Sequence, residues 1–154
     1  MKVLVGVDES AHAEATLEFV RGMSWPADTE IVVVSAVALP AAVYSEAYAP
    51  AVVDMSRLLA DLTRLHQDVA SRSARTLAQA GLHARERVPL GDARDVLIEE
   101  AQKERADLII VGSHGRTGLA KLLMGSVASH VVTHAPCSVL VVRRAASGER
   151  EKTS

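Results

Sequence analysis

The chain has 154 residues, 49% of them hydrophobic and only 3% aromatic, so we expect one packed domain with an aliphatic core. The formal net charge of −2 argues against nucleic acid or an anionic membrane as a general partner. Because Cys137 is the one cysteine, no intramolecular disulfide can form, and a reducing, cytoplasmic location is the simpler interpretation. No apolar run approaches the length of a membrane span, and Asp8 comes too early for a signal peptide.

The predicted elements alternate between strands and helices along the chain. Short apolar runs predict strands at residues 2–7, 31–37, 83–88, 107–111 and 138–142. Helical periodicity predicts helices from Ser10 to about Met23, from Asp54 to about Ala80, from Asp92 through Ala101, and from Ser126 to about His134. We expect Ser10 and Ser126 to be N-caps, Gly81 to be the C-cap of the second helix, and the aliphatic stripe of that helix to be core. This alternation predicts an α/β domain with a parallel sheet and helices on both faces.

Two segments fall outside the alternation. Residues 38–53 contain Pro40, Pro50 and two tyrosines among many alanines, and they are too many for a simple turn. We expect a lid or an interface loop there. The chain is polar from Arg143 onward, which predicts a frayed end. We therefore assign residues 1–146 to the domain and 147–154 to a polar C-terminal tail.

The most informative motif follows the fourth predicted strand. It is Gly112-Ser113-His114-Gly115, then nine residues, then Gly125-Ser126-Val127 at a predicted helix start. Glycines let the backbone approach an anion and adopt positive φ, and the free N–H groups of a helix start point at that anion. The spacing matches neither the dinucleotide fingerprint nor the Walker pattern. The motif alone also fits a plain strand-to-helix turn with Ser126 as an N-cap.

With its flanks, this pattern resembles the nucleotide-binding branch of the universal stress protein family. The matching pieces are, in order, Val3–Ser10, Val111–Arg116, Leu123–Val127 and Ala135–Val142. The resemblance covers nearly the whole chain. It implies a Rossmann-like (adenine nucleotide alpha hydrolase-like) fold, a five-stranded sheet of order 3-2-1-4-5, and ATP bound between the first and fourth strands.

The resemblance also implies a set of binding residues. Its adenine pocket corresponds to Gly6, Val7, Asp8 and Ala36. Its phosphate loop corresponds to Gly112, His114, Gly115, Arg116, Gly125, Ser126 and Val127. ATP normally arrives with Mg²⁺, for which Asp8 is the nearest candidate carboxylate, and Arg116 and Lys121 add positive charge. Asp8 is alternatively an ordinary residue that caps the helix starting at Ser10.

The function that we predict is an ATP-binding stress-response sensor or regulator with slow hydrolysis at most, because no enzyme signature is present. Ala128 stands where ATP-binding relatives often have a hydroxyl residue, which weakens the case for a γ-phosphate contact. The alternative is a nucleotide-independent dimeric interaction module that binds a protein partner. Under either reading we expect a homodimer, because the strand Ser138 to Val142 is apolar, is expected at a sheet edge, and pairs in similar family members.

The remaining candidates have weaker patterns. His130 and His134 have the i, i+4 spacing of two metal ligands, but no third ligand accompanies them, so a solvated helix face is favoured. His12, His66 and His83 are isolated in the sequence, and Cys137 is expected to be a buried, unreactive thiol. Tyr44 and Tyr48 either flank the adenine or a partner chain, or belong to a mobile loop.

Overall fold

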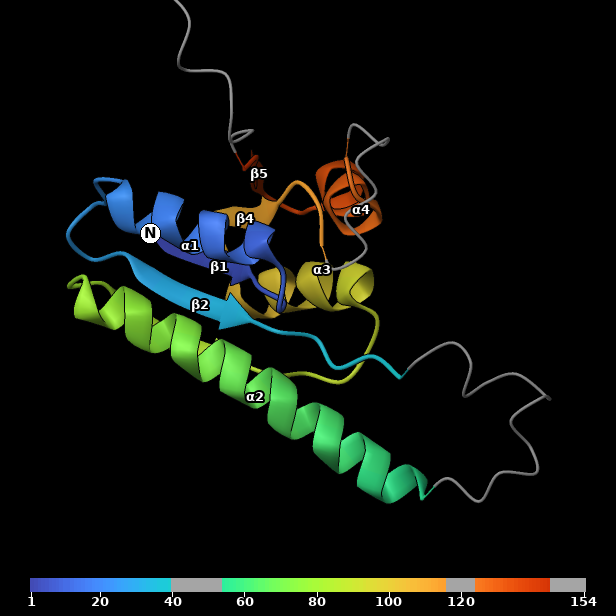
Figure 1. Cartoon of the computed structure of the whole chain (residues 1–154). Helices are drawn as coiled ribbons and strands as arrows, with labels where there is room; N and C mark the ends of the chain where they lie inside the picture. Colours follow the sequence, from blue (N-terminus) through green and yellow to red (C-terminus); the bar gives the residue numbers. More distant parts are fainter. Residues whose placement is uncertain (40–53, 116–123, 145–154) are drawn as a thin grey trace, which may run out of the picture.

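The computed structural model of the chain describes residues 1–39, 54–115 and 124–144. Its five strands form one parallel sheet in the order β3-β2-β1-β4-β5, which confirms the predicted topology (Figure 1). The strands are β1 (Lys2–Gly6), β2 (Glu30–Val34), β3 (His83–Arg87), β4 (Leu108–Gly112) and β5 (Ser138–Val142). The second strand ends at Val34, short of the predicted residue 37, and Val37 makes only an isolated bridge to Leu90.

In the described part of the chain, the helices that connect the strands are α1 (Ala11–Gly22), α2 (Met55–Gln79), α3 (Ala93–Glu104) and α4 (Ser126–His134). The sheet separates two apolar cores. Val3 and Val5 face the core shared with α1 and α2, whereas Leu4 between them faces the core shared with α3 and α4. All three side chains are completely buried. Burial on both faces explains why the central strands are continuous aliphatic runs, and it confirms the prediction of helices on both sides.

The helix ends agree with the sequence prediction at most positions. The Ser10 hydroxyl accepts a hydrogen bond from the N–H of Ala13, which makes it the N-cap of α1. The C-cap of α2 is Ala80, one residue before the predicted Gly81, and Gly81 follows it with a left-handed φ of +84° that ends the helix. The prediction for Ser126 is wrong. Ser126 is the first residue of α4, and the N-cap is Gly125, which has no side chain to make a cap hydrogen bond.

Helix α2 is buried along only part of its length. Its buried residues begin at His66 and end at Leu77, whereas Met55 and Leu65 are exposed. Figure 1 shows the first turns of this helix extending past the end of the sheet. The expectation that the whole aliphatic stripe belongs to the core is therefore wrong for the first half of α2.

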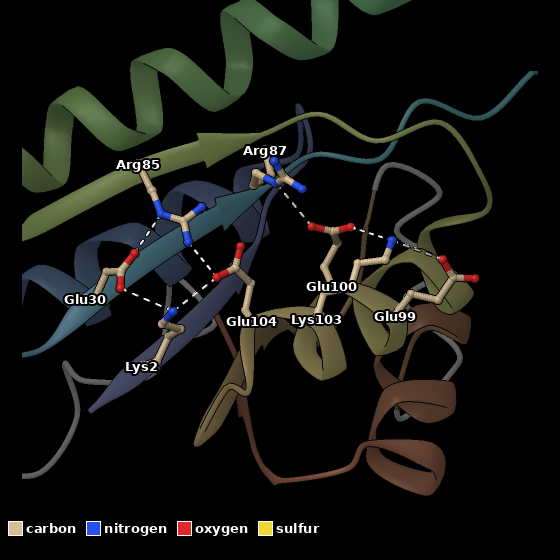
Figure 2. Close-up of polar contacts among 8 residues, drawn as sticks. All are labelled: Lys2, Glu30, Arg85, Arg87, Glu99, Glu100, Lys103 and Glu104. Carbon is tan, nitrogen blue, oxygen red and sulfur yellow. Dashed lines mark hydrogen bonds and ion pairs between the residues drawn. The ribbon is translucent and has the colours of Figure 1, made fainter.

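The outer strand β3 is charged and is tied to its neighbours by ion pairs (Figure 2). The Arg85 guanidinium contacts Glu30 of β2 at 2.7 Å and Glu104 of α3 at 2.6 Å. Lys2 of β1 contacts the same two carboxylates. A second group joins Arg87 of β3 to α3 through Glu100, Lys103 and Glu99. Lys2, Arg85 and Arg87 thus meet α3 on the sheet face that carries this helix (Figure 2).

The described helices are all too short or too polar to cross a lipid bilayer.

Candidate functional site

A crevice opens at the carboxyl ends of β1 and β4. At this point the chain turns from β1 toward β2 on one side and from β4 toward β5 on the other. Open parallel sheets bind ligands at such a reversal. The empty space in the crevice, including its open mouth, is about 490 Å³. Its walls are formed by Gly6, Val7, Asp8, Ala13, Val34, Ala36, Ala93, Leu97, Val111, Gly112, His114, Gly115 and Val127.

Most of the predicted binding residues meet in this crevice. Those that line it are Gly6, Val7, Asp8, Ala36, Gly112, His114, Gly115 and Val127. Gly125 and Ser126 stand beside it at the start of α4 but are not among its lining residues. Arg116 and Lys121 lie outside the described residues, as do Tyr44 and Tyr48. The structure thus brings together segments that are more than 100 residues apart in the chain.

Helix α3 supplies two lining residues that sequence reasoning missed, Ala93 and Leu97. They come from the first two turns of the helix, which begins at the same edge of the sheet. Their only sequence signal is an apolar pair at i, i+4 next to the helix start, and core residues have the same pattern. The packing of α3 against the sheet decides which of these residues face the crevice. The other missed lining residues are Ala13, Val34 and Val111.

The glycines of the motif are required by close approach. A Cβ atom on Gly115 would lie 2.8 Å from Oδ2 of Asp8, and one on Gly112 would lie 3.1 Å from Cβ of His12. A Cβ on Gly125 would lie 3.2 Å from the carbonyl oxygen of Ser113. The expected positive φ is not found at these three positions, because the described glycines with positive φ are Gly81 and Gly91. The motif keeps side chains out of a narrow space, and its backbone is not left-handed.

The two carboxylate oxygens of Asp8 have different neighbours. Its Oδ1 accepts hydrogen bonds from the N–H of Ser10, at 3.0 Å, and from the Ser10 hydroxyl. This oxygen therefore stabilises the turn that starts α1, as the alternative interpretation expected. Its Oδ2 is the oxygen that faces Gly115. One carboxylate thus supports the helix start and also forms part of the crevice wall.

Two histidines stand together next to the glycine loop. The ring of His12 on α1 lies 5.4 Å from the ring of His114, measured between centroids, with the planes inclined by 49°. Nδ1 of His114 is also 3.1 Å from the Ser113 hydroxyl. His12 is therefore not isolated, and neither is His66, whose Nδ1 lies 2.8 Å from the buried Ser35 hydroxyl. Sequence spacing could not reveal either contact, because each joins different elements of the fold.

The start of α4 is held against the end of β4 by backbone hydrogen bonds. The N–H of Gly125 donates to the carbonyl of Ser113 at 2.7 Å, and the N–H of Ser113 donates to Val142 of β5 at 2.8 Å. Ala128 is only 2% exposed and packs in the core between α3, α4 and the sheet. It is not a lining residue of the crevice, so the lack of a hydroxyl there does not remove a group from its wall.

Two ionisable groups outside the crevice wall, Asp92 and Cys137, have shifted pKa values. Hydrogen bonds from Arg94 lower the pKa of Asp92, the N-cap of α3, to about 2. Burial raises the pKa of the Cys137 thiol, and Asp107 adds to the effect. A raised pKa keeps this thiol protonated, which agrees with an unreactive cysteine, but Cys137 is only partly buried and not fully buried as predicted. Within residues 1–39, 54–115 and 124–144, no three acidic, histidine or cysteine side chains are gathered to hold a metal.

Comparison with known proteins identifies the family of this chain. The sequence profile of the Universal stress protein family matches residues 1–143. The chain belongs to this family. A universal stress protein of Methanocaldococcus jannaschii is 33% identical over 112 residues, which are 65% of this chain and 66% of the relative. The solved structure of the MJ0577 protein from the same organism matches 95% of this chain and 97% of its own, with a TM-score of 0.80 and 26% identity.

Two solved structures of the family contain nucleotides. An Arabidopsis thaliana family protein with AMP bound has a TM-score of 0.65 and 21% identity, and the match covers 95% of this chain and 93% of that one. A universal stress protein in complex with cAMP has a TM-score of 0.66 and 22% identity, with 92% and 96% covered. At these identities the likeness establishes a shared fold.

Proposed function

We propose that this stress protein binds an adenine nucleotide, ATP above all, in the crevice between β1 and β4, and acts as a sensor or regulator. The observation that carries the proposal is the glycine-walled crevice at the reversal point of the sheet. Gly112 and Gly115 line this crevice, and a Cβ atom would crowd His12 at Gly112 and the Asp8 carboxylate at Gly115. The AMP and cAMP complexes of proteins with the same fold support an adenine nucleotide as the ligand.

Each end of the crevice suits one part of such a ligand. The apolar wall made by Val7, Ala36 and Leu97 suits the adenine ring. The glycine side, with His114 and Val127, leads to the start of α4, whose positive helix end favours phosphate. In this assignment Arg116, Gly125 and Ser126 also belong to the phosphate loop. Asp8 is the candidate ligand for a Mg²⁺ ion that accompanies the phosphates.

We expect ATP to be held and not rapidly consumed. Fast phosphoryl transfer needs a group that positions the attacking nucleophile and charge that stabilises the γ-phosphate. Among the described lining residues His114 is the titratable candidate besides Asp8, and its Nδ1 is occupied by Ser113. Phosphate release should be far below the roughly 1–100 s⁻¹ typical of kinases. Turnover in that range, lost in His114→Ala, would show instead that the protein is an ATPase.

The nucleotide proposal is tested by mass spectrometry of ligand released from purified protein, followed by calorimetric titration with Mg-ATP. Gly115→Val should abolish binding, because its side chain meets Asp8 and enters the crevice. Gly22→Ala is the matched control, since nothing lies within 4 Å of the added carbon. If Gly115→Val bound Mg-ATP with the same affinity as the wild type, the nucleotide would have to bind outside this crevice.

A homodimer through β5 is the second part of the proposal. This strand is at the edge of the sheet, and Val139, Leu140 and Val141 are only partly buried. The alternative function, a nucleotide-independent dimeric module with a protein partner, rests on the same surface. Protein that dimerises but gives an empty crevice under saturating Mg-ATP would favour that alternative. The cytoplasmic location and the domain limit at residue 146, with its tail at 147–154, remain predictions from the sequence.

A further inference from the structure

Histidines also gather away from the crevice, on α4. His130 and His134 are one helical turn apart, with ring centroids 4.2 Å apart and planes inclined by 23°. A carboxylate from the neighbouring helix joins them. Oδ1 of Asp95, on α3, lies 3.7 Å from Nε2 of His130. Sequence spacing offered no third ligand because Asp95 is distant along the chain, and the packing of α3 against α4 brings it to the pair.

The distance between His130 and Asp95 suits a shared ion. It is too long for a hydrogen bond. Zinc bonds of about 2.1 Å at a tetrahedral angle place two ligand atoms about 3.4 Å apart. The Asp95 side chain is 68% exposed, so it has room to move the small remaining distance. The two atoms are thus spaced nearly as a tetrahedral ion requires.

His134 makes a hydrogen bond to the backbone of its own helix. Its Nδ1 lies 2.9 Å from the carbonyl oxygen of His130. A carbonyl oxygen only accepts, so Nδ1 carries the hydrogen and Nε2 is the nitrogen left for a metal ion. The i, i+4 spacing then places both imidazoles on one face of α4.

We propose that His130, His134 and Asp95 form a site for a borderline transition-metal ion such as Zn²⁺ or Ni²⁺. The three side chains are not yet gathered around one point, so His134 must turn toward the other two as the ion binds, and water completes the coordination. Both helices also line the crevice, through Ala93 and Val127. The ion would therefore fasten α3 to α4 beside the proposed nucleotide site, although the metal proposal does not depend on a nucleotide.

The test uses the nucleotide-free, tag-free chain after treatment with a chelator. Zn²⁺ is titrated by calorimetry and in competition with a chromophoric chelator, and we expect one ion per chain at micromolar concentrations. His130→Ala and His134→Ala should each weaken binding by about tenfold or more, and Asp95→Asn by less. His83→Ala, at an exposed histidine of β3, is the control and should bind like the wild type.

Two results would overturn the proposal: no stoichiometric binding by the wild type, or binding that His130→Ala or His134→Ala leaves unchanged. Thermal unfolding gives a second readout. Zn²⁺ should raise the melting temperature of the wild type and of His83→Ala but not that of His130→Ala. Alanine is a strong helix former, so the α4 variants are expected to fold.

Discussion

The two outer strands of the sheet differ sharply in chemistry. Strand β3 has the sequence His-Ala-Arg-Glu-Arg, and its arginines reach across the sheet face to carboxylates of β2 and α3. Strand β5 has the sequence Ser-Val-Leu-Val-Val and carries no charged residue. Each strand has one hydrogen-bonded neighbour in the sheet. Each edge strand therefore has backbone groups that could pair with another strand, but the side chains at the two edges are very different.

This difference favours β5 over β3 as the edge used by the proposed dimer. Charged side chains on an outer strand disfavour pairing, because a partner strand would have to desolvate them. At β3 the arginines are also engaged in ion pairs that fix their positions (Figure 2). At β5 the aliphatic residues stay partly exposed even with α1 and α4 packed nearby. We infer that β3 is protected by charge and that β5 is left available for dimer formation.

The largest expected effect comes from a proline in the apolar edge. Val141→Pro removes a backbone donor from β5 and should turn the dimer into monomers or insoluble protein. Light scattering at micromolar concentration measures the change. Glu86→Pro places the same residue in β3 and should lower stability while the dimer persists. A wild type that is monomeric at micromolar concentration would contradict the dimer itself.

The next effect comes from making β3 resemble β5. The double variant Arg85→Val, Arg87→Val removes both arginines from this edge and puts aliphatic side chains in their place. We expect assemblies larger than those of the wild type, which sedimentation velocity would detect. Arg64→Val with Arg75→Val makes the same charge change on the exposed face of α2 and should leave the assembly unchanged. Equal behaviour of the two double variants would show that β3 is not protected by its arginines.

A smaller effect is expected inside the charged network. Glu100 is 2% exposed and contacts Nε of Arg87 at 3.3 Å and Nζ of Lys103 at 3.0 Å. Glu100→Gln keeps the shape but removes the charge, and should lower the free energy of unfolding by roughly 1–3 kcal/mol. Glu99→Gln, on an exposed neighbour, should cost at most about 0.5 kcal/mol. Urea denaturation compares the two, and equal losses would mean that burial of Glu100 adds nothing.

The smallest effect is a dependence of stability on acid. Hydrogen bonds from Arg85 are the main cause of the lowered pKa values of Glu30 and Glu104. A carboxyl with a lowered pKa stabilises the fold above its ordinary value of 4.5, and this contribution disappears as the pH falls through the folded-state pKa. Thermal unfolding should therefore show Arg85→Met less stable than wild type at neutral pH, with the gap closing in acid. If Arg85→Met were less stable than wild type by the same amount at every pH, the lost stability would come from packing of the Arg85 side chain and not from its charge.

The sequence predicted local features better than contacts between distant segments. The bounds of β5 follow from a proline before an apolar run, and they agree with the structure residue by residue. The order of strands came from the family resemblance, because alternation alone does not say which strands are neighbours. Ser126 was assigned as a cap from its residue type, yet Gly125 takes that position.

The parts of the site that were not predicted all depend on tertiary packing. Leu97 reaches the crevice, and Asp95 reaches His130, only because of how α3 lies on the sheet and against α4. The ion pairs of Arg85 likewise join three separate segments of the chain. In each case the residue type was visible in the sequence, but its partner was not.

The peptide groups of Ser113 connect the glycine loop to the apolar edge. The N–H of this residue donates to Val142 at the end of β5, and its carbonyl accepts from Gly125 at the start of α4. A ligand that displaces the loop must carry the end of β5 with it or lengthen one of these bonds. Thermodynamic linkage requires any such coupling to act equally in both directions. Association of two chains would then change nucleotide affinity by the same factor as nucleotide changes association, so apparent affinity would vary with protein concentration.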